Sequence, residues 1–389
     1  MIRLLTLIQK PLGRSPGQRF RLEQWAPQLE AHHGIRLDFL PFESPRLTEI
    51  LYRPGHAAEK AVWMLRDTFR RRRVLSEARG YDGVVIYREA ASLGPAIYER
   101  LLARASVPLF VDFDDAIWIT VKGANGIFSH LRFAGKTATI CRLSSAVIVG
   151  NEYLAAYARR YSDSVFTVPT SIDLSRYPVQ PGLPADAPFT IVWSGSLPTL
   201  VHLEHARAPL EVLGKRRRVV LRVIGNEPPA RPFEGIETVF IPWREAGEAE
   251  TIGAAHVGIM PMPDDEFSRG KCGLKGLQYM ALGLPVVLSP VGVNAEIVEH
   301  GQNGLLASST EEWVGALERL ANSAELRSVI GRAARRTVEQ RYSTESSAAR
   351  FAEAVRHGLG RSVLLERRRP ARPQPGRAPE ERHAPTNRT

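Results

Sequence analysis

The chain of 389 residues holds only two cysteines, Cys141 and Cys272, and it lacks any long apolar run. Two cysteines cannot build a disulfide framework, which favours a reducing, cytoplasmic setting. The apolar run at residues 4–8 is too short for the core of a signal peptide, and no small-residue cleavage site follows it. A membrane-spanning helix would need about 20 apolar residues. We therefore expect no secretion signal and no transmembrane segment, and we interpret residues 4–8 as a first buried strand.

Several catalytic signatures are absent as well. The sequence has no G-x-x-x-x-G-K-[ST] phosphate loop and no G-x-G-x-x-G fingerprint at the end of a predicted strand, which argues against kinases, ATPases and standard dehydrogenases. It also lacks the G-x-S-x-G and H-E-x-x-H motifs, which argues against the common hydrolases.

Acidic residues are too few to balance the basic ones, and the formal net charge is +11. Eight arginines and three glutamates in residues 361–389 supply about half of this excess. This segment is rich in proline and poor in apolar residues, so we expect it to be a disordered tail. Nucleic-acid binding would rest on charge alone, because no aromatic-plus-basic motif of a known module is present. We expect no nucleic-acid partner.

A second basic cluster, residues 70–73, lies in a helix expected over residues 58–79. The apolar residues on or near one side of this helix are Val62, Leu65, Phe69 and Leu75. Two interpretations remain open. The arginines either solvate the face of an ordinary helix, or they dock the protein peripherally on an anionic membrane, at the inner face of the cell membrane.

Short buried-strand candidates alternate with helical patterns along two halves of the chain, which predicts parallel βαβ units. The strand candidates are residues 4–8, 37–42, 83–87, 109–113, 146–149 and 165–168, followed by 190–193, 219–224, 238–241, 257–260 and 285–288. The helical candidates include residues 97–105, 153–161, 310–322 and 324–359. The fold class is therefore α/β, with two Rossmann-like, doubly wound parallel-sheet domains facing a cleft lined by the loops after the strands.

The Pro- and Gly-rich stretch between the halves is typical of a linker. The expected division is a first domain at residues 1–178, a linker at 179–189, a second domain at 190–340, a C-terminal helix at 341–360 that packs back on the first domain, and the tail at 361–389.

The most informative segment is residues 264–304, DDEFSRGKCGLKGLQYMALGLPVVLSPVGVNAEIVEHGQNG. A loop containing Gly270 and Gly273 opens a helix whose first N–H groups favour an anion. Lys271 and Lys275 stand four apart at the same end and would stabilise a diphosphate whose charge grows during transfer. The alternative is a lysine pair that solvates an ordinary helix start.

Residues 268–304 resemble the donor-binding region of the glycosyltransferase family 4 (group 1) enzymes. The likeness extends to TIVWSGSLPTLVHLE, VIGN and PTSIDLSRYP, and in the first half to RFRLEQWAPQLEAHHGI and VDFDDAIWI. The resemblance implies the GT-B architecture, in which the second of two facing domains holds a nucleotide sugar. It also implies retaining transfer, with no metal and no cofactor beyond the nucleotide-diphosphate sugar as co-substrate.

This sequence departs from the family pattern at the donor site. The family has two glutamates eight apart, where this chain has Gly270 and Gln278. The resemblance implies that Gln278 holds the ribose as a neutral hydrogen-bonding group, and that Asp265 or Glu266 could replace the first glutamate. The family's basic residues after the first strand of the second domain are also missing, and Val201 and His202 stand about where its lysine would be. The remaining donor contacts that the resemblance implies are Gly195, Ser196, Cys272, Gly273, Gly292, Asn294 and Glu296.

Three carboxylates, Asp112, Asp114 and Asp115, stand at the end of a predicted strand. Clustered carboxylates suit a hard cation, but neighbours on a strand point to opposite sides, and the last two could equally cap a helix or bind hydroxyl groups. By resemblance Asp114 takes the place of a family histidine at the catalytic site. We expect it to orient acceptor or donor hydroxyls without a metal.

The loop after the first strand contains Gly13, Gly17 and Arg19, and Arg88 follows a later strand. The resemblance implies that this loop faces the sugar and the leaving phosphate, with Arg88 as an acceptor contact. The alternative is a turn that leads into a solvated basic helix. The lone histidines His130, His205 and His256 have no metal-ligand spacing and are interpreted as structural.

The leading hypothesis is a retaining, hexosyltransferase-like enzyme of the kind used in polysaccharide biosynthesis, which moves a sugar from a nucleotide-diphosphate sugar to a glycan or lipid-linked acceptor. Its catalytic residues would be Lys271, Lys275 and Asp114. The alternative is a non-catalytic protein of the same fold that binds a nucleotide sugar or a glycan. The glutamate missing at Gly270 and the basic residues missing near Gly195 favour this alternative.

Overall fold

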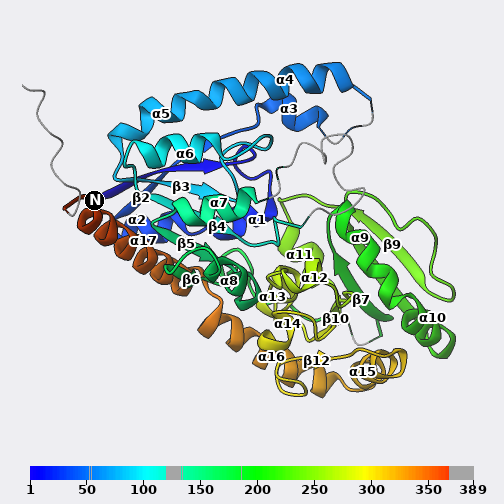
Figure 1. Ribbon diagram of the computed structural model, residues 1–389. Helices are drawn as coiled ribbons and strands as arrows, with labels where there is room; N and C mark the ends of the chain where they lie inside the picture. The colour runs from blue at the N-terminus through cyan, green and yellow to red at the C-terminus, as the bar shows by residue number, and fades with distance from the viewer. Residues whose placement is uncertain (52, 54, 120–132, 134, 185, 368–389) are drawn as a thin grey trace, which may run out of the picture.

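The structure is a computed structural model that describes residues 1–51, 53, 55–119, 133, 135–184 and 186–367. Within this part of the chain two sheets of parallel strands each carry helices on both faces (Figure 1). The parts built on them are called the first and the second domain. No helix in the described residues is long and apolar enough to cross a bilayer.

The first sheet has six strands in the order β2-β1-β3-β4-β5-β6. They are β1 (Ile2–Ile8), β2 (Ile35–Pro41), β3 (Gly83–Tyr87), β4 (Leu109–Phe113), β5 (Ala146–Val149) and β6 (Val165–Thr167). Strands β3, β4 and β5 are buried throughout. Their near-continuous apolar sequences reflect helices on both faces, as parallel sheets require. The strand predictions for this half are confirmed within about two residues at each end, a normal uncertainty for element boundaries.

The second sheet has the order β12-β11-β10-β7-β8-β9. Its strands are β7 (Phe189–Ser194), β8 (Val219–Gly225), β9 (Glu237–Pro242), β10 (Val257–Met260), β11 (Val286–Leu288) and β12 (Leu305–Leu306). The first five were predicted, and the two-residue β12 was not. The α/β fold class with two doubly wound parallel sheets is confirmed.

The helices of the first domain are α1 (Pro16–Gln18), α2 (Ala26–His33), α3 (Pro45–Ile50), α4 (Ala57–Arg70), α5 (Val74–Glu77), α6 (Ile97–Arg104), α7 (Lys136–Leu143) and α8 (Glu152–Arg159), with a π-helical turn at Arg19–Glu23. Those of the second domain are α9 (Leu197–Leu203), α10 (Arg207–Arg216), α11 (Glu248–Gly253), α12 (Glu266–Arg269), α13 (Leu274–Ala281), α14 (Asn294–Ile297), α15 (Thr310–Asn322) and α16 (Ala324–Arg341). The last helix is α17 (Thr344–Arg367).

The predicted helical region over residues 324–359 is divided into two helices, because the chain breaks between α16 and α17, next to the boundary expected at residue 341. Tyr342 leaves the helical conformation, and Ile172 donates a backbone hydrogen bond of 2.8 Å to its carbonyl. Apolar periodicity cannot show such a long-range backbone pairing. Helix α17 also continues to Arg367, beyond the expected start of the tail at residue 361, because the first helix-breaking proline is Pro370. Residues 368–389 lie outside the described residues.

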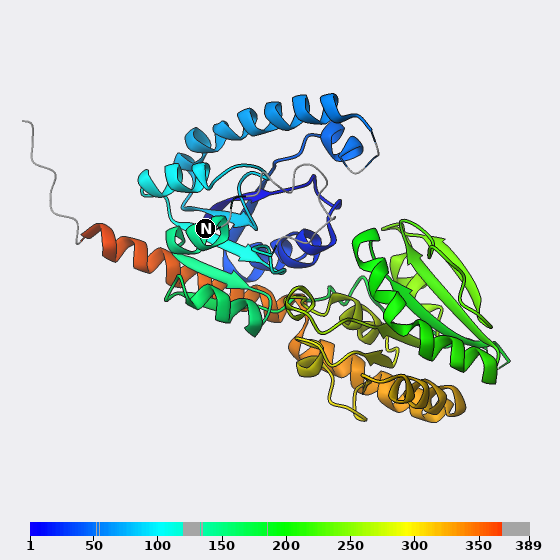
Figure 2. The same ribbon diagram turned by 45° about the vertical axis from the view of Figure 1, so that its right-hand side comes forward.

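Helix α17 runs from the second domain back along the first (Figures 1 and 2). The rings of Trp25 and Phe351 lie 5.6 Å apart, and Arg356 donates a hydrogen bond of 2.9 Å to the carbonyl of His33. The chain therefore passes between the domains twice, once before β7 and once between α16 and α17.

Candidate functional site

The strand order places two groups of loops at the junction of the domains. In the first sheet, β1 lies between β2 and β3, so the connections after β1 and β3 leave in opposite directions. The second sheet reverses in the same way between β7 and β10. Such reversals open a crevice beyond the carboxyl ends of the strands, where α/β proteins bind ligands. Most of the site residues predicted from sequence follow β1, β3, β7 or β10.

Lys275 lies in the first turn of α13, just after Gly273, whose φ of 69° begins the helix. Its Nζ atom is 3.2 Å from Thr199 Oγ1 and 4.3 Å from the centre of the Trp193 ring. Among the described residues no carboxylate lies within ion-pair distance of this ammonium group. Burial, with a smaller contribution from the charge of Lys271, lowers the pKa of Lys275 to about 7. An anion bound here would supply the missing negative charge.

His202, on α9, is buried close to the two lysines. Burial lowers its pKa to about 4, and the charges of Lys275 and Lys271 contribute to this shift. The imidazole is therefore neutral at pH 7. The sequence showed only that His202 stands about where the family has a lysine, and it gave no sign of Trp193 or Thr199, which approach Lys275 through the turn from β7 into α9.

Lys271 does not share the environment of Lys275. Its Nζ atom lies 2.7 Å from Asp115 Oδ1 of the first domain, and its backbone carbonyl accepts a 2.9 Å hydrogen bond from Asn151 Nδ2. The neighbouring Gly270 is pressed against the first domain, since a Cβ atom there would lie 2.8 Å from the Cβ of Ala116. A glutamate cannot fit at position 270 in this arrangement.

Asp114 lies at the centre of a polar cluster on the first domain. Its Oδ1 atom accepts hydrogen bonds from Tyr87 Oη at 2.8 Å and from Arg88 Nη2 at 2.8 Å. Arg88 Nη2 also lies 2.6 Å from Asp115 Oδ2. Burial alone would raise the pKa of Asp114, but the charges of Arg88 and Arg21 and the hydrogen bonds from Arg88 and Tyr87 outweigh it and lower the pKa. Asp114 is therefore an ionised hydrogen-bond acceptor.

Gly17 packs closely against the polar cluster around Asp114. A Cβ atom at this position would lie 2.3 Å from Tyr87 Oη and 2.5 Å from Asp114 Oδ2, so any side chain would displace them. The loop that carries Gly17 thus lies directly over Asp114. Tyr87, the last residue of β3, was missed from the sequence because it is also the expected apolar end of a buried strand.

Asp112, the last residue but one of β4, has a different partner from Asp114 and Asp115. It forms a two-pronged ion pair with Arg21, with both oxygen–nitrogen distances at 2.7 Å and both side chains fully buried. The three aspartates are therefore not joined in one site. Among the described residues no cluster of three or more His, Cys, Asp or Glu side chains is arranged to hold a metal.

Gln278 and Arg19 belong to a second network that links the domains. Gln278 Nε2 donates to Tyr177 Oη at 2.8 Å, and Tyr177 Oη donates to Glu248 at 2.6 Å. Arg19 Nη2 pairs with the same Glu248 at 2.7 Å and Nη1 with Glu245 at 3.5 Å. The charge of Arg19 is thus neutralised in place, and Gln278 is buried against Tyr177 rather than open to a ribose. Neither partnership could be foreseen from sequence, because each joins residues at least 70 positions apart.

The other predicted donor contacts are distributed around these networks. Cys272 Sγ lies 3.2 Å from the carbonyl oxygen of Asp114, and burial raises the pKa of its thiol. Asn294 is buried and donates to the carbonyl of Ser289 at 3.1 Å. Glu296 is exposed. Gly292 packs on the backbone of Arg269, where a Cβ atom would lie 2.7 Å from the carbonyl oxygen.

The glycines of the two opposing loops are also placed. Gly13, with φ of 74°, faces Glu245 of the second domain, and a Cβ atom there would lie 3.2 Å from its carboxylate. Gly195 donates its backbone N–H to the carbonyl of Ile224 at 2.9 Å, and the exposed Ser196 begins α9.

The acidic residues proposed to replace the missing glutamate lie at the start of α12. Asp265 caps α12 by accepting from the backbone N–H of Ser268 at 2.7 Å, and Glu266 is exposed. His256 is structural, since its Nδ1 accepts from the backbone N–H of Thr190 at 3.0 Å and burial lowers its pKa to about 4. His205 is exposed, and His130 lies outside the described residues.

Comparisons with known proteins agree with the resemblance. Residues 188–323 match the family model described as "Glycosyl transferases group 1". The D-inositol 3-phosphate glycosyltransferase of Saccharomonospora viridis is 30% identical over 237 residues, which cover 52% of this chain and 53% of that protein. The match thus spans about half the length of this relative.

Solved structures share the fold over more than nine tenths of the chain. Sucrose-phosphate synthase from Thermosynechococcus elongatus superposes with a TM-score of 0.66 at 16% identity, over 94% of this chain and 100% of that one. HepE from Anabaena, in complex with UDP-glucose, superposes with a TM-score of 0.59 at 16% identity, over 92% of this chain and 100% of that one. The family model confirms the resemblance to the group 1 glycosyltransferases over residues 188–323, and the solved structures confirm the GT-B architecture.

Proposed function

We propose that the protein is a retaining glycosyltransferase that moves a sugar from a nucleotide-diphosphate sugar to a glycan or lipid-linked acceptor. The observation that carries the proposal is Lys275, a partly buried ammonium group without a carboxylate partner among the described residues, at the start of α13. The fold neighbour HepE holds UDP-glucose, which supports a nucleotide-diphosphate sugar as the donor here.

In this proposal the diphosphate binds at the first turn of α13, where the unpaired N–H groups of the helix and Lys275 face it. Lys271 joins when its ion pair with Asp115 opens or extends to the phosphate. Both lysines then stabilise the charge that grows on the departing diphosphate, which is the main electrostatic contribution to catalysis. The rest is positioning and exclusion of water by the two domains.

The first domain supplies the groups that orient the sugar or the acceptor. Asp114 is held ionised by Arg88 and Tyr87, which leaves its second oxygen available to accept from a hydroxyl group beside Gly17. Arg88 acts by fixing Asp114 rather than as an independent acceptor contact. Transfer of a hexose with retention, in polysaccharide biosynthesis and without a metal or a further cofactor, follows from the resemblance and belongs to the same proposal.

The test begins with a thermal-shift screen against nucleoside diphosphates, since a ligand at 100 times its Kd stabilises a protein by about 2.7 kcal/mol. Nucleotide release is then measured with a panel of nucleotide-diphosphate sugars and soluble glycan acceptors. Lys275→Ala should lower kcat/KM by about 10²-fold, as expected for the loss of a group that stabilises transition-state charge. Lys215→Ala, at an exposed lysine of α10 in the same domain, is the matched control. A kcat/KM within about threefold of the unmodified protein for Lys275→Ala would refute the assignment.

A second candidate is a non-catalytic protein that binds a nucleotide sugar or a glycan. The observation that favours it is Gly270, whose contact with Ala116 leaves no space for the carboxylate that the family carries there. Fold alone does not decide between the two. Binding of a nucleotide diphosphate without nucleotide release from any sugar donor would favour this candidate.

A further inference from the structure

Helix α4 presents an apolar stripe to solvent. Val62, Leu65 and Phe69 are 63%, 71% and 67% exposed, and their spacing of three and four residues puts them on one side of the helix. The opposite side carries the buried Met64 and Asp67. These three residues are called the α4 stripe. Single exposed apolar residues are common on protein surfaces, but a row of three along one helix indicates an interaction surface.

The charges around the α4 stripe are basic. Arg66, Arg72 and Arg73 are exposed, and no carboxylate among the described residues forms an ion pair with them. Arg66 lies over the Trp63 ring at 4.6 Å and Arg72 over the Phe69 ring at the same distance, so their carbon stems lie along aromatic surface. The acidic residue Glu59 is neutralised by Arg46 at 2.7 Å.

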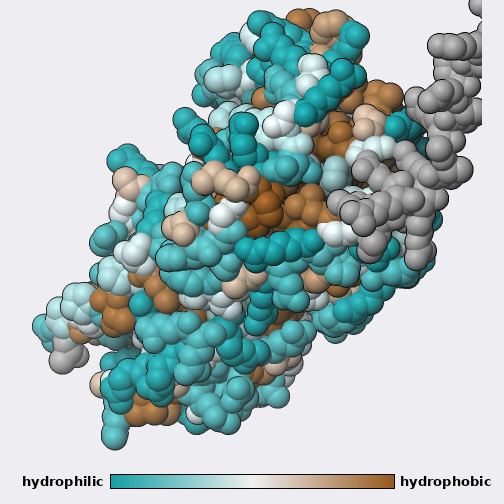
Figure 3. All heavy atoms as spheres, turned by 90° about the vertical axis from the view of Figure 1, so that its left-hand side faces the viewer, coloured by the Kyte–Doolittle hydropathy of each residue, from teal (hydrophilic) through white to brown (hydrophobic). Residues whose placement is uncertain are grey.

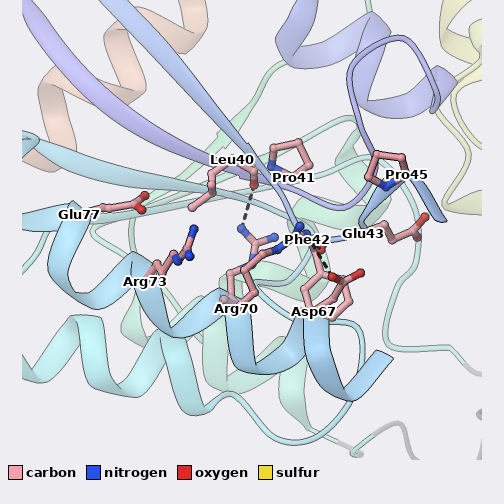
Figure 4. Close-up of a pocket in the computed structure, with 10 residues that line it drawn as sticks. Leu40, Pro41, Phe42, Glu43, Pro45, Asp67, Arg70, Arg73 and Glu77 are labelled. Carbon is pink, nitrogen blue, oxygen red and sulfur yellow. Dashed lines mark hydrogen bonds and ion pairs between the residues drawn. The ribbon is translucent and has the colours of Figure 1, made fainter. Parts of the chain in front are cut away.

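The helix is firmly attached to the domain beneath it. Arg70 and Arg71 donate to the backbone carbonyls of Phe42 and Leu40 at 2.7 and 2.8 Å, and Asp67 accepts from the backbone N–H of Ser44 at 2.7 Å. Figure 4 shows Arg70, Asp67 and Arg73 around a cavity of about 280 Å³ between α4 and the end of β2. Because Asp67 already lies beside the residues that follow β2, the part of α4 that precedes it overhangs the carboxyl end of the first sheet.

Elsewhere in the part of the chain that the structure describes, exposed hydrophobic residues do not form a row of three on one helix. Figure 3 shows one face of the molecule on which hydrophobic side chains appear as separate patches within a largely hydrophilic surface. Of the other exposed apolar residues of the described chain, Ile97 and Leu101 form a pair on α6, and those such as Val179, Val201 and Val329 come from different elements.

We propose that the α4 stripe and its flanking arginines are a docking surface for an anionic lipid membrane. A helix that lies in a membrane interface combines an apolar face with basic residues at its borders, and each arginine near an anionic surface adds to the attraction. A symmetric contact between two copies of this chain would instead bring Arg66, Arg72 and Arg73 of both copies together, which like-charge repulsion opposes. The charge around the α4 stripe therefore fits an anionic lipid surface better than a second copy.

Docking through α4 has a geometric consequence for the site. The carboxyl end of the first sheet, from which the loop with Gly13 and Gly17 leaves, lies on the side that the helix overhangs. A membrane at α4 would lie next to this side of the first domain, where a lipid-linked acceptor could enter. The docking itself does not depend on the proposed sugar transfer, and it can be tested without any donor.

The experiment is flotation of the full-length protein with vesicles. One preparation is phosphatidylcholine alone, and the other is an equal mixture of phosphatidylcholine and phosphatidylglycerol. We expect binding to the anionic vesicles that weakens as salt rises, and little binding to the neutral ones. The variant Leu65→Gln/Phe69→Gln should reduce the partition coefficient at least tenfold, because it removes both large apolar groups. The variant Arg66→Gln/Arg72→Gln should reduce it by a similar factor at low salt.

The matched control is Val329→Gln/Arg332→Gln, which removes an exposed valine and an exposed arginine from α16 and should bind as the unmodified protein does. Circular dichroism confirms that each variant is folded. Equal binding to neutral and anionic vesicles would overturn the proposal. Undiminished binding of Leu65→Gln/Phe69→Gln to the anionic vesicles would also overturn it. The arginines of residues 368–389 would then account for the attraction to the vesicles. A change of oligomeric state in that variant, measured by light scattering, would assign the α4 stripe to a second copy and would overturn it too. If the unmodified protein binds anionic vesicles but releases no nucleotide from any sugar donor, that result would count against the proposed function alone.

Discussion

Lys275 should take up a proton when a nucleoside diphosphate binds. In the unliganded protein burial holds its pKa at about 7, so near pH 8 roughly a tenth of the molecules carry the charge. A diphosphate at the start of α13 favours the protonated form and should return the pKa toward the ordinary value of 10.5. Binding at pH 8 should therefore be accompanied by uptake of roughly 0.9 of a proton, and binding at pH 6 by roughly 0.1.

The sign of the pH dependence follows from the same shift. The complex binds more protons than the free protein between the two pKa values, so affinity should fall by up to tenfold for each unit of pH above about 7. At pH 8 the terminal phosphate is already ionised, because its second pKa is near 6. The proton taken up therefore reports on the protein rather than on the nucleotide.

The measurement is isothermal titration calorimetry of UDP binding at pH 8, in buffers with different ionisation enthalpies. The dependence of the observed heat on the buffer gives the number of protons taken up. Lys275→Met keeps the length of the side chain and should abolish the uptake, while Lys215→Met should leave it unchanged. Uptake near zero in the unmodified protein, or equal uptake in Lys275→Met, would refute the reasoning even if UDP binds.

Three further substitutions test the packing of the junction. Asp112→Asn leaves the buried Arg21 without its counter-charge and should lower the free energy of unfolding by about 3–5 kcal/mol in urea titrations; a loss under about 1 kcal/mol would mean that the pair is solvated. Gly17→Ala should displace Tyr87 and Asp114 and reduce nucleotide release at least tenfold, with a melting temperature close to normal; full activity would show that the loop can move away without cost. Gly270→Glu restores the residue typical of the family but has no space beside Ala116, so the melting temperature should fall by several degrees; an unchanged value would show that the junction opens readily in solution.

The strands were predictable because both sheets are parallel and buried, so each strand is a short apolar run bounded by turn residues. The start of α13 was predictable for a local reason, since Gly273 and Lys275 are two residues apart in sequence and remain close in space. The other contacts of the candidate site depend on partners that are far apart in sequence. The ion pair of Lys271 with Asp115 joins residues 156 positions apart, and nothing in either segment indicates the other.

The departure at Gln278 shows the same limit. As a sequence position it is an isosteric replacement for a glutamate, which suggests an unchanged role with weaker hydrogen bonds. In the structure its amide donates to Tyr177, which in turn donates to Glu248. The family carries a negative charge at this position of α13, whereas in this chain the negative charge of the network is that of Glu248 on α11. That charge is shared with Arg19, and only the three-dimensional arrangement shows the exchange.

The double passage of the chain between the domains determines how they can move. Ile172 lies on the first passage and Ser343 on the second, and the two are joined by a parallel backbone bridge, with Ile172 N bonded to the carbonyl of Tyr342 at 2.8 Å and Thr344 N to that of Ile172 at 3.3 Å. Because the two crossing segments are hydrogen-bonded side by side, they form one short hinge. This hinge permits one domain to rotate about it and resists twisting or sliding of the domains against each other. Opening and closing would then have close to a single degree of freedom. The loops of the two domains would then return to the same register at every closure.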